Sequence, residues 1–246
     1  MGKVPSRQPS FFDQKRVWIK YEDEVNKERV EKTIAMIPQV PSILEIGCGS
    51  GSILNRLSSD LIVGLDLSRV ALEEIIHERV VGSGDLLPFK DFSFDAVILA
   101  EVLEHLNNTQ LRKTLEEVTR VAHSYVLVSV PSKEMPWETF VKCARCGSSY
   151  SPYGHQQYFD EDRVRSLIKS KHQRIEFCGV KRRLSSVKRM MQKIGIYGYR
   201  ENSICPFCGS EKLRYGMIEK NANRALGLLS RFAPSEPNWI LCLYEL

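Results

Sequence analysis

The sequence predicts an α/β fold, with a mostly parallel sheet covered by helices and a smaller element inserted late in the chain. Three observations favour this fold. Up to Pro131, short apolar runs alternate with segments of helical periodicity, which is the order of strands and helices in a parallel sheet. The apolar runs are nearly continuous, as expected of strands buried on both faces. The chain ends on "NWILCLYEL", which suits a last strand that closes the sheet.

The elements of the predicted core follow one another in a regular order. Residues 22–37 repeat apolar positions at helical spacing, and Pro38 and Pro41 end that helix. Five strands are predicted in "SILEIG", "LIVGLDL", "RVVGSGD", "SFDAVILAE" and "SYVLVSVP". Helices are predicted between them at residues 52–59, 68–80 and 108–122.

The regular order breaks after Pro131. "FDEDRVRSLIKS" predicts a helix capped by Asp160, "HQRIEFCGV" a sixth strand, and residues 184–194 a basic helix. Because the last strand returns to the sheet, residues 181–237 are expected to form an insertion. The predicted division is an N-terminal cap or lid at 1–40, a core at 41–180 with 238–246, and a basic, metal-binding insertion at 138–155 with 181–237.

The composition is that of an ordinary globular protein, with 43% apolar and 26% charged residues among 246. No apolar run reaches the roughly 18 residues of a membrane-spanning helix, and "MGKVPSRQPSFFDQKR" lacks the apolar region of a signal peptide. A cytoplasmic location is expected, with peripheral attachment to a membrane as the alternative. In that reducing compartment, cysteine pairs favour metal or redox chemistry over structural disulfides.

A glycine-rich loop follows the first predicted strand and precedes a helix. Gly47, Gly49 and Gly51 let the backbone approach a ligand closely and expose N–H groups. On this evidence alone, the alternative is a tight strand–helix turn. Acids at three successive strand ends, Glu45, Asp66 and Asp85, sharpen the interpretation, because they suit a ligand with hydroxyl and amino groups and would repel a dinucleotide phosphate.

Four stretches resemble the successive motifs of class I S-adenosylmethionine-dependent methyltransferases, and within them the type 11-like group. They are "ILEIGCGSG", "GLDLS", "GDLLPF" and "FDAVILAEVLEHL". Their order and spacing match over roughly residues 25–180 and the last strand. The resemblance implies a Rossmann-like, seven-stranded, mostly parallel sheet with an antiparallel last strand, and S-adenosylmethionine as cofactor. The carrier is already activated, so the protein mainly supplies positioning and a proton acceptor.

The resemblance also implies which residues contact the cofactor. Glu45 and the glycine loop hold the methionine end, Asp66 takes the ribose hydroxyls, Asp85 and Leu86 lie at the adenine, and Glu101 and Val102 lie under the sulfonium. The full set of expected cofactor-binding residues is Glu45, Gly47, Cys48, Gly49, Gly51, Asp66, Leu67, Asp85, Leu86, Glu101 and Val102.

The segment after the fourth strand, "AEVLEHL", has three interpretations. If a helix starts here, Glu101, Glu104 and His105 share one face and bind a divalent ion such as Mg²⁺, with His155 as a fourth ligand. This pattern is similar to that in small-RNA 2′-O-methyltransferases and ubiquinone-pathway O-methyltransferases. Alternatively, His105 is a general base near neutral pH, or the segment only packs and caps. The candidate catalytic residues are His105, Glu104 and His155.

Two cysteine pairs predict a structural zinc site. Cys143 and Cys146 lie in "CARCG", and Cys205 and Cys208 lie in "CPFCG". Two such knuckles supply four thiolates and leave no open position on the metal, so the zinc is expected to be structural. The alternative is two unrelated thiol or redox pairs. The other cysteines, Cys48, Cys178 and Cys242, are expected to behave as small apolar residues.

A basic stretch distinguishes the second half of the chain. Residues 163–200 hold twelve basic residues and one acid, a net charge of +11 in a chain whose total is +5. Such a block suits RNA, a phosphorylated metabolite or an anionic lipid surface. RNA-binding surfaces usually interleave aromatic residues, and here they are few. "ANRALGLLSRF" is expected to be an amphipathic helix that packs on the core or lies on a membrane.

Aromatic residues at two further places are candidates for ligand contact. Phe11, Phe12, Trp18 and Tyr21 would form a lid over the cofactor, as N-terminal segments of similar proteins do. Tyr153, His155 and Tyr158 fall where those proteins place substrate-contacting loops.

Three functions follow from these patterns. The first is methyl transfer to an oxygen or nitrogen of an anionic small molecule, a glycan or a lipid-linked acceptor. The second is RNA methylation, including a metal-assisted 2′-O type, through the basic stretch 163–200. The third is a non-catalytic cofactor-binding module that recruits a partner.

Overall fold

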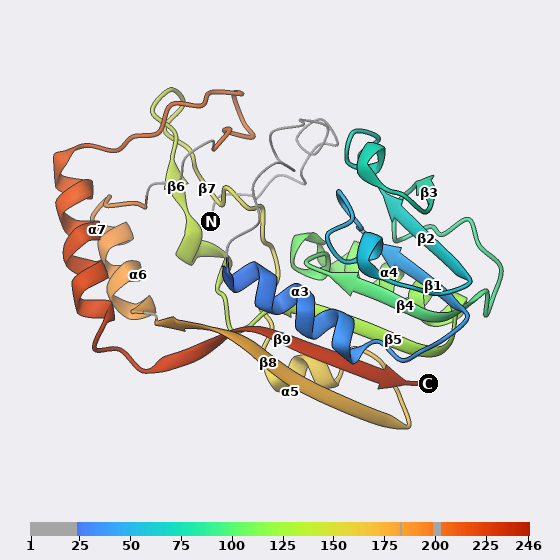
Figure 1. Cartoon of the computed structure of the whole chain (residues 1–246). Helices are drawn as coiled ribbons and strands as arrows, with labels where there is room; N and C mark the ends of the chain where they lie inside the picture. The colour runs from blue at the N-terminus through green and yellow to red at the C-terminus, as the bar shows by residue number, and fades with distance from the viewer. Residues whose placement is uncertain (1–23, 183, 199–202) are drawn as a thin grey trace. The chain divides into compact units, whose positions relative to one another are not determined.

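The computed structural model describes residues 24–182, 184–198 and 203–246 (Figure 1). The strands are β1 (Ser42–Ile46), β2 (Leu61–Asp66), β3 (Glu78–Val81), β4 (Phe94–Ala100), β5 (Ala122–Pro131), β6 (Val141–Lys142), β7 (Ser149–Tyr150), β8 (His172–Arg182) and β9 (Ser235–Glu245). The α-helices are α3 (Glu24–Met36), α4 (Asn108–Val121), α5 (Glu161–Arg165), α6 (Ser185–Lys193) and α7 (Met217–Ser230). Short 3-10 helices are η1 (Leu54–Arg56), η2 (Ala71–Glu74), η3 (Leu103–His105) and η4 (Pro136–Thr139).

The described residues fall into two compact units. The sheet unit comprises 24–132, 159–179 and 237–246, and the cysteine unit comprises 133–158 and 180–236 apart from 183 and 199–202. Helix α3 belongs to the sheet unit. The predicted lid residues Phe11, Phe12, Trp18 and Tyr21 lie outside the described residues.

The sheet unit is built on a seven-stranded sheet in the order β3-β2-β1-β4-β5-β9-β8. β1 lies parallel between β2 and β4, with Glu45 opposite Gly64 on one side and Ile98 on the other. β9 is antiparallel to β5, with Cys242 opposite Val128. The predicted Rossmann-like sheet with an antiparallel last strand is therefore confirmed. The carboxyl ends of β1, β2 and β4 meet at one edge.

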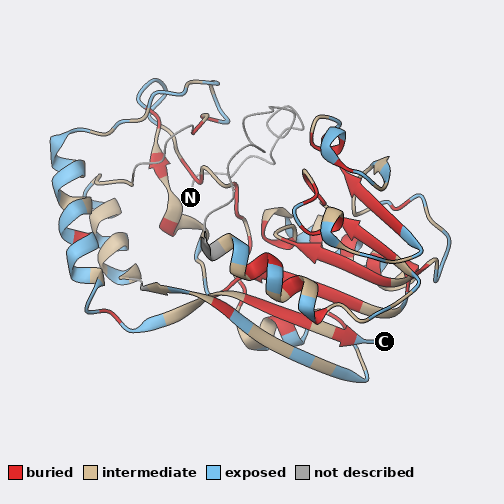
Figure 2. Cartoon of the chain, in the orientation of Figure 1, coloured by how far each residue is buried: buried red, intermediate tan, exposed pale blue. Residues whose placement is uncertain are grey.

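The two faces of the sheet are covered by different helices, and the strands between them are largely buried (Figure 2). Leu44 and Ile46 of β1 pack with α4 and α5, whereas Ile43 packs with Val30 and Met36 of α3. Because the side-chain period of a strand is two, Glu45 points to the same face as Ile43. That face is the one covered by α3.

Two of the predicted helices are much shorter than expected. Within 52–59 the helical part is only η1, and within 68–80 it is only η2, because β3 already begins at Glu78. Both turns pack into one small cluster of Cys48, Leu54, Ile62, Leu72 and Ile75, so a single 3-10 turn already buries the apolar residues that suggested a full helix.

Helix α4 begins at Asn108, not at Glu101 as the metal interpretation required. Asn107 caps it by accepting hydrogen bonds from the N–H groups of Thr109 and Gln110, while the Gln110 side chain accepts from the Asn107 N–H. This reciprocal cap fixes the start of the helix. No helix in the described part of the chain combines the length and apolarity needed to cross a bilayer.

Candidate functional site

The glycine loop after β1 is held at the carboxyl edge of the sheet by the end of β2. The N–H of Gly47 donates to the carbonyl of Leu65 at 2.7 Å, and the N–H of Gly49 donates to Oδ2 of Asp66 at 2.9 Å. Gly47 has φ +68°, and a Cβ there would lie 2.4 Å from Cγ2 of Val102. The loop thus requires glycine at this position and brings Val102 against it.

Asp66 anchors the glycine loop. Its Oδ1 accepts from the N–H of Ser68 at 2.8 Å, as Oδ2 does from the N–H of Gly49. The carboxylate is therefore held beside the loop, where the ribose contact is expected.

Glu45 is a buried carboxyl group with an unused oxygen. It is 3% exposed, and Oε2 has no hydrogen-bond partner among the described residues. Burial raises its pKa from 4.5 to about 8, although the nearby Arg29 charge and the Leu54 N–H favour the ionised form. A ligand ammonium group is the natural partner for such an acceptor, because it would stabilise the buried carboxylate.

Arg29 of α3 provides a complementary cation on the same face of the sheet. The residue is 8% exposed, and its Nε and Nη1 have no hydrogen-bond partner in the part of the chain that is described. Its guanidinium carbon lies 5.6 Å from the ring centre of Trp239, and Trp239 is opposite Pro131 at the carboxyl end of β5. Unpaired buried donors of a guanidinium are costly and suit a ligand carboxylate.

Glu45 and Arg29 together suit an α-amino acid group. The carboxyl of Glu45 would meet the ammonium and the guanidinium of Arg29 would meet the carboxylate. Sequence patterns did not identify Arg29 as a site residue, because it occupies an apolar position in the helical repeat of residues 22–37. The available signal was the charge itself, since an arginine on the buried face of an amphipathic helix needs a partner.

Leucines beside the next two acids offer apolar contact at the same edge. Leu67 follows Asp66 at the end of β2 and is 50% exposed, and Leu86 follows Asp85 and is 79% exposed. Asp85 accepts a hydrogen bond from the Ser83 hydroxyl. Exposed leucines next to carboxylates suit a flat heterocycle with amino groups, which is compatible with the expected adenine contacts.

Cys48 occupies the glycine loop, but its side chain points away from the loop's ligand face. The residue is buried in the small cluster with Leu54 and Ile62, and burial raises the pKa of its thiol. Any cofactor contact by Cys48 would therefore come from its backbone.

The turn after β4 is strained at its first residue. Glu101 has φ +60°, which is rare for a residue with a side chain, and its N–H donates to the Ser129 carbonyl at 2.9 Å. Such strain is often retained at functional positions. Glu104 and His105 follow in η3, so the predicted common face of one α-helix does not exist.

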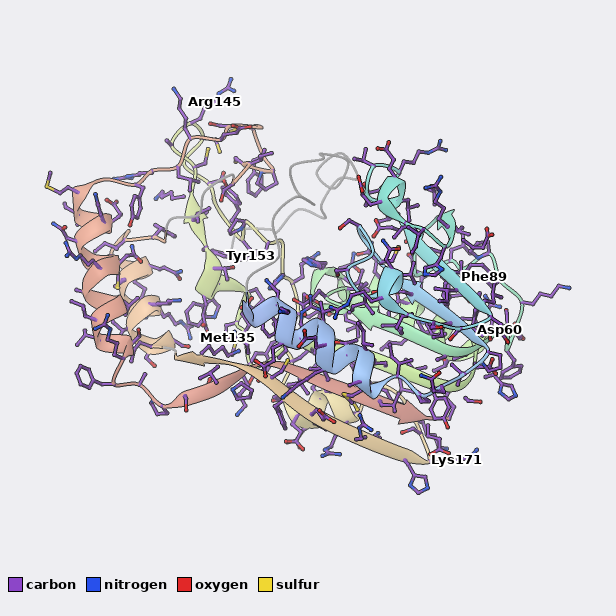
Figure 3. The ribbon with its side chains drawn as sticks, viewed as in Figure 1. Asp60, Phe89, Met135, Arg145, Tyr153 and Lys171 are labelled. Atoms are coloured by element: carbon purple, nitrogen blue, oxygen red, sulfur yellow. The ribbon has the colours of Figure 1, made fainter. Side chains whose placement is uncertain are left out.

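The third candidate catalytic residue, His155, belongs to the cysteine unit. There its Nδ1 lies 2.5 Å from Oε1 of Glu134, and its ring stacks on Tyr153 with ring centres 5.4 Å apart. Tyr153 is labelled in Figure 3. These contacts orient the imidazole within its own unit.

The predicted zinc ligands come together in the cysteine unit. The sulfur atoms of Cys143, Cys146, Cys205 and Cys208 all lie within 4.8 Å of one another. Cys178 and Cys242 lie apart from them, buried in the sheet unit.

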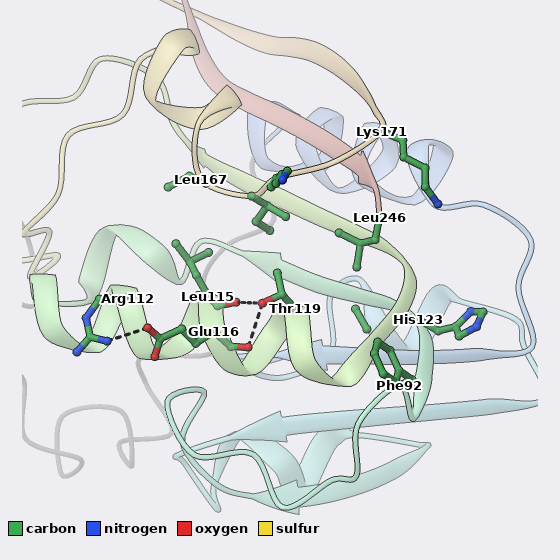
Figure 4. Close-up of a pocket in the computed structure, with 12 residues that line it drawn as sticks. Phe92, Arg112, Leu115, Glu116, Thr119, His123, Leu167, Lys171 and Leu246 are labelled. Atoms are coloured by element: carbon green, nitrogen blue, oxygen red, sulfur yellow. Dashed lines mark hydrogen bonds and ion pairs between the residues drawn. The ribbon is translucent and has the colours of Figure 1, made fainter.

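An open pocket in the sheet unit is distinct from the site at the glycine loop (Figure 4). It has a volume of about 740 Å³ and lies next to α4, at the beginning of β5 and the end of the chain. Its lining includes Leu115, Ala122, His123 and Leu246. It therefore lies at the amino end of β5, whereas the glycine loop lies at the carboxyl ends of parallel strands, where α/β folds bind ligands.

Residues 44–127 match the model of a protein family described as "Methyltransferase domain". Among curated proteins, the uncharacterized proteins MJ1252, MJ0638 and MJ1123 of Methanocaldococcus jannaschii are 34%, 37% and 29% identical over 104, 81 and 123 residues. These matches cover 42%, 32% and 48% of this chain. They span only 39%, 35% and 54% of the relatives' lengths.

Similar folds occur in solved structures at low sequence identity. An S-adenosylmethionine-dependent methyltransferase from Archaeoglobus fulgidus has a TM-score of 0.54 at 14% identity and covers 89% of this chain and 91% of its own. One from Thermotoga maritima has a TM-score of 0.53 at 14% identity, and the alignment covers 89% of this chain and 88% of its own. The methyltransferase in a complex with the Haloferax volcanii activator Trm112 has a TM-score of 0.52 at 15% sequence identity. The alignment covers 96% of this chain and 94% of that methyltransferase. These likenesses show the fold, and with the family match they support a class I methyltransferase domain.

Proposed function

We propose that the chain is an S-adenosylmethionine-dependent methyltransferase, with its cofactor site at the carboxyl edge of β1, β2 and β4. The observation that carries the proposal is the buried pair of Glu45 and Arg29, whose unpartnered oxygen and nitrogens suit the ammonium and carboxylate of a methionine group. The glycine loop, Asp66, Leu67, Asp85 and Leu86 suit the remaining parts of the nucleoside.

When bound, the cofactor supplies a methyl group on a sulfonium, activated for in-line displacement. The protein's own contribution is placement. Val102 packs on the glycine loop and Glu101 is held in its unusual conformation beside Ser129, so both are fixed at the edge where the reacting groups would meet. Such positioning accounts for much of the acceleration in group-transfer reactions.

His105 and Glu104 are proposed to orient or deprotonate the acceptor. Both are in η3, directly after Val102. Binding of Mg²⁺ by these residues and His155 is the alternative role. Activity that survives both a chelator and His105→Ala would contradict a metal role and a base role together.

The acceptor is proposed to be an oxygen or nitrogen of an anionic small molecule, a glycan or a lipid-linked compound. Support comes from α6, which carries Lys188, Arg189 and Lys193 and no acid. Beside it, a cavity of about 240 Å³ is lined by two bases, Lys133 and Arg189, and by two acids, Glu138 and Glu236. The charges of this lining balance, so the support for an anionic acceptor comes from the basic face of α6.

RNA remains the second candidate acceptor. The basic stretch is divided between the two units, and in the sheet unit Arg165 pairs with Glu161 and Arg174 with Glu176. These bases are partly engaged already, and aromatic residues for stacking are few. Salt-dependent binding to bulk RNA with a steep slope would favour RNA, and no affinity at low salt would exclude it.

The decisive experiment is transfer of a labelled methyl group from S-adenosylmethionine to fractionated cell extract, with and without nuclease. We expect label in a nuclease-resistant fraction retained on an anion exchanger. Label that disappears with nuclease would favour the RNA acceptor. Cofactor binding without any label transfer would favour a non-catalytic module and contradict the enzyme, and absence of cofactor binding would contradict the site itself.

A further inference from the structure

The cysteine unit brings four thiols close together. The sulfur atoms of Cys143 and Cys208 are 3.6 Å apart, as are those of Cys146 and Cys205. Ligands at a Zn–S distance of about 2.3 Å in a tetrahedron are separated by about 3.8 Å. A disulfide requires a separation of about 2.05 Å, and all four cysteines are free. The spacing therefore fits four ligands of one ion.

The two cysteine loops are copies of one another in sequence and in backbone hydrogen bonding. Both read C-x-x-C-G-S. In the first, the N–H of Cys143 donates to the Ser148 carbonyl at 2.9 Å and that of Gly147 to the Cys143 carbonyl at 3.1 Å. In the second, the N–H of Cys205 donates to Ser210 at 2.9 Å and that of Gly209 to Cys205 at 2.9 Å.

The repeat extends to the glycines that end each loop. Gly147 has φ +73° and Gly209 has φ +69°. No atom lies within 4 Å of a Cβ built at either position. The glycines are therefore required by the turn itself and not by crowding.

Backbone N–H groups in both loops point at the sulfur atoms. Cys143 accepts from the N–H groups two and three residues later, and Cys205 does the same. Cys146 and Cys208 each accept from the N–H of the serine two residues later. The backbone of the two loops is therefore folded around the sulfur atoms in the same way.

The charged residues around the four sulfur atoms are mostly basic, which would offset the negative charge of a metal–thiolate centre. The apolar residues there form only a small core that could stabilise the unit without a metal. Four thiolates and one divalent ion carry a net charge of −2, and the sequence in and beside the loops holds four bases, Lys142, Arg145, Lys212 and Arg214, and one acid, Glu211. Arg145 stands at the tip of the first loop (Figure 3). The buried cluster here adds only Val141, Tyr150 and Leu213 to the cysteines, which is a very small core for a stable fold.

The two loops are also tied together by backbone hydrogen bonds. The N–H of Ala144 donates to the Lys212 carbonyl at 2.9 Å, and that of Arg214 donates to the Lys142 carbonyl at 2.7 Å. This ladder sets the segment before the first loop beside the segment after the second. The two segments form a short antiparallel pair, and the two cysteine loops beside it bring their four sulfur atoms together.

We propose that Cys143, Cys146, Cys205 and Cys208 bind one structural Zn²⁺ ion that holds the cysteine unit together. Four thiolates fill the tetrahedral coordination of zinc and leave no position for water or substrate, so the ion takes no part in chemistry. Each thiol loses its proton to solvent when the ion binds. A redox-active dithiol is disfavoured, because each sulfur atom lies 3.6 Å from a sulfur atom of the opposite loop, which is the separation expected of two ligands of one metal ion.

The test uses the full chain, purified under reducing conditions without added metal. We expect about one zinc per chain by elemental analysis. Cys143→Ser and Cys205→Ser should each lose most of the zinc, whereas the matched buried variants Cys178→Ser and Cys242→Ser should retain it. Cofactor binding, which depends on the sheet unit, reports whether each variant has folded and keeps this test separate from that of the proposed function.

A second measurement protects the conclusion if the loop variants do not fold. After removal of zinc, Co²⁺ added to the wild-type chain should give the absorption of tetrahedral cobalt bound to thiolates, and added Zn²⁺ should abolish it. Stoichiometric iron in place of zinc would overturn the assignment of the metal. Neither zinc nor iron in the purified chain, together with no thiolate absorption on adding Co²⁺, would overturn the site.

Discussion

At the scale of single residues, the candidate site is defined by groups that the fold buries without satisfying. Glu45 and Arg29 lie on one face of the sheet. One carboxylate oxygen of Glu45 and two guanidinium nitrogens of Arg29 have no hydrogen-bond partner among the described residues. Buried polar groups are nearly always paired in folded proteins. Two of opposite charge that remain unpaired therefore indicate a zwitterionic ligand.

Arg29→Met tests this interpretation directly. Methionine retains much of the side-chain length but lacks the guanidinium, so the variant should bind S-adenosylmethionine about 10- to 100-fold more weakly, as expected for loss of a charge-assisted hydrogen bond. The free energy of unfolding should not fall, because the lost donors had no partner. Calorimetric titration and urea unfolding measure the two effects.

A matched control is Arg112→Met. Within the described residues, the ion pair of Arg112 is with Glu116 on the exposed surface of α4, so neither affinity nor stability should change by more than a small amount. Equal loss of affinity in both variants would show that Arg29 does not contact the cofactor.

Glu45 should make stability depend on pH. Its pKa is about 8 in the folded chain and near 4.5 when unfolded, so the folded state holds the proton more tightly. The ligand-free protein should therefore lose stability as pH rises from about 4.5 to about 8. Glu45→Gln should remove that part of the pH dependence, as measured by urea unfolding at pH 5, 6.5 and 8.

The same group should couple cofactor binding to proton release. A ligand ammonium favours the carboxylate, so binding at pH 7 should release protons from the wild-type chain and not from Glu45→Gln. Titrations in buffers of different ionisation enthalpy measure this release. An identical proton balance in both proteins would mean that the Glu45 carboxyl does not meet the ligand's amino group.

At the scale of elements, the glycine loop depends on close contact between two turns. Gly47→Ala would place a Cβ 2.4 Å from Val102 and force alanine to φ +68°. We expect a loss of about 1–3 kcal/mol in stability and weaker cofactor binding. Thermal unfolding and calorimetric titration provide both values.

Gly227→Ala in α7 serves as the control for that substitution. No atom lies within 4 Å of a Cβ at this position, and alanine is favoured over glycine inside a helix by about 1 kcal/mol. The variant should be unchanged or slightly more stable. Equal destabilisation by the two substitutions would contradict the steric explanation.

The strands could be predicted from sequence, as could the acids Glu45 and Asp66 at the ends of β1 and β2, but the turns could not. Asp85, expected to end the third strand, lies in the turn after β3, which already ends at Val81. "SILEI" and "DAVILA" are rich in apolar residues because both faces of these strands are buried, and short runs of this kind bounded by glycine or acidic residues are typical of buried strands. Residues 52–59 and 68–80 suggested helices because their apolar residues recur at helical spacing. One 3-10 turn in each satisfies the same burial, and composition does not distinguish a turn from a longer helix.

Two features of the candidate site could not be predicted from the sequence, the role of Arg29 and the conformation of η3. A charged residue at an apolar helical position gives no sign of its partner until the helix is placed over Glu45. The predicted common face of Glu101, Glu104 and His105 assumed continuous helical geometry, whereas Glu101 adopts a positive φ. The cysteine pairs were easier to interpret, because their spacing and their glycines already specify the turn.

At the scale of the whole molecule, the two units have separate apolar cores. Three clusters lie in the sheet unit, and the fourth holds Val141, Cys143, Tyr150 and Cys205 in the cysteine unit. A core this small should depend on its metal, whereas the sheet should not.

Chelation should therefore affect the two units unequally. In hydrogen exchange, removal of zinc should increase exchange in residues 141–150 and 205–214 and leave β1, β4 and β5 nearly unchanged. S-adenosylmethionine should protect the sheet unit even after chelation. Uniform exchange throughout the chain would indicate one cooperative unit and contradict this prediction.

The two C-x-x-C-G-S loops occupy different connections of the sheet. One lies between β5 and α5, and the other lies between β8 and β9, neighbouring strands of the sheet (Figure 1). Each loop supplies two of the four proposed metal ligands, so a homologue that lost one loop would keep two cysteines that cannot complete a tetrahedral zinc site. The two loops should therefore be inherited together: homologues should carry both or neither, although the loops are far apart in the gene.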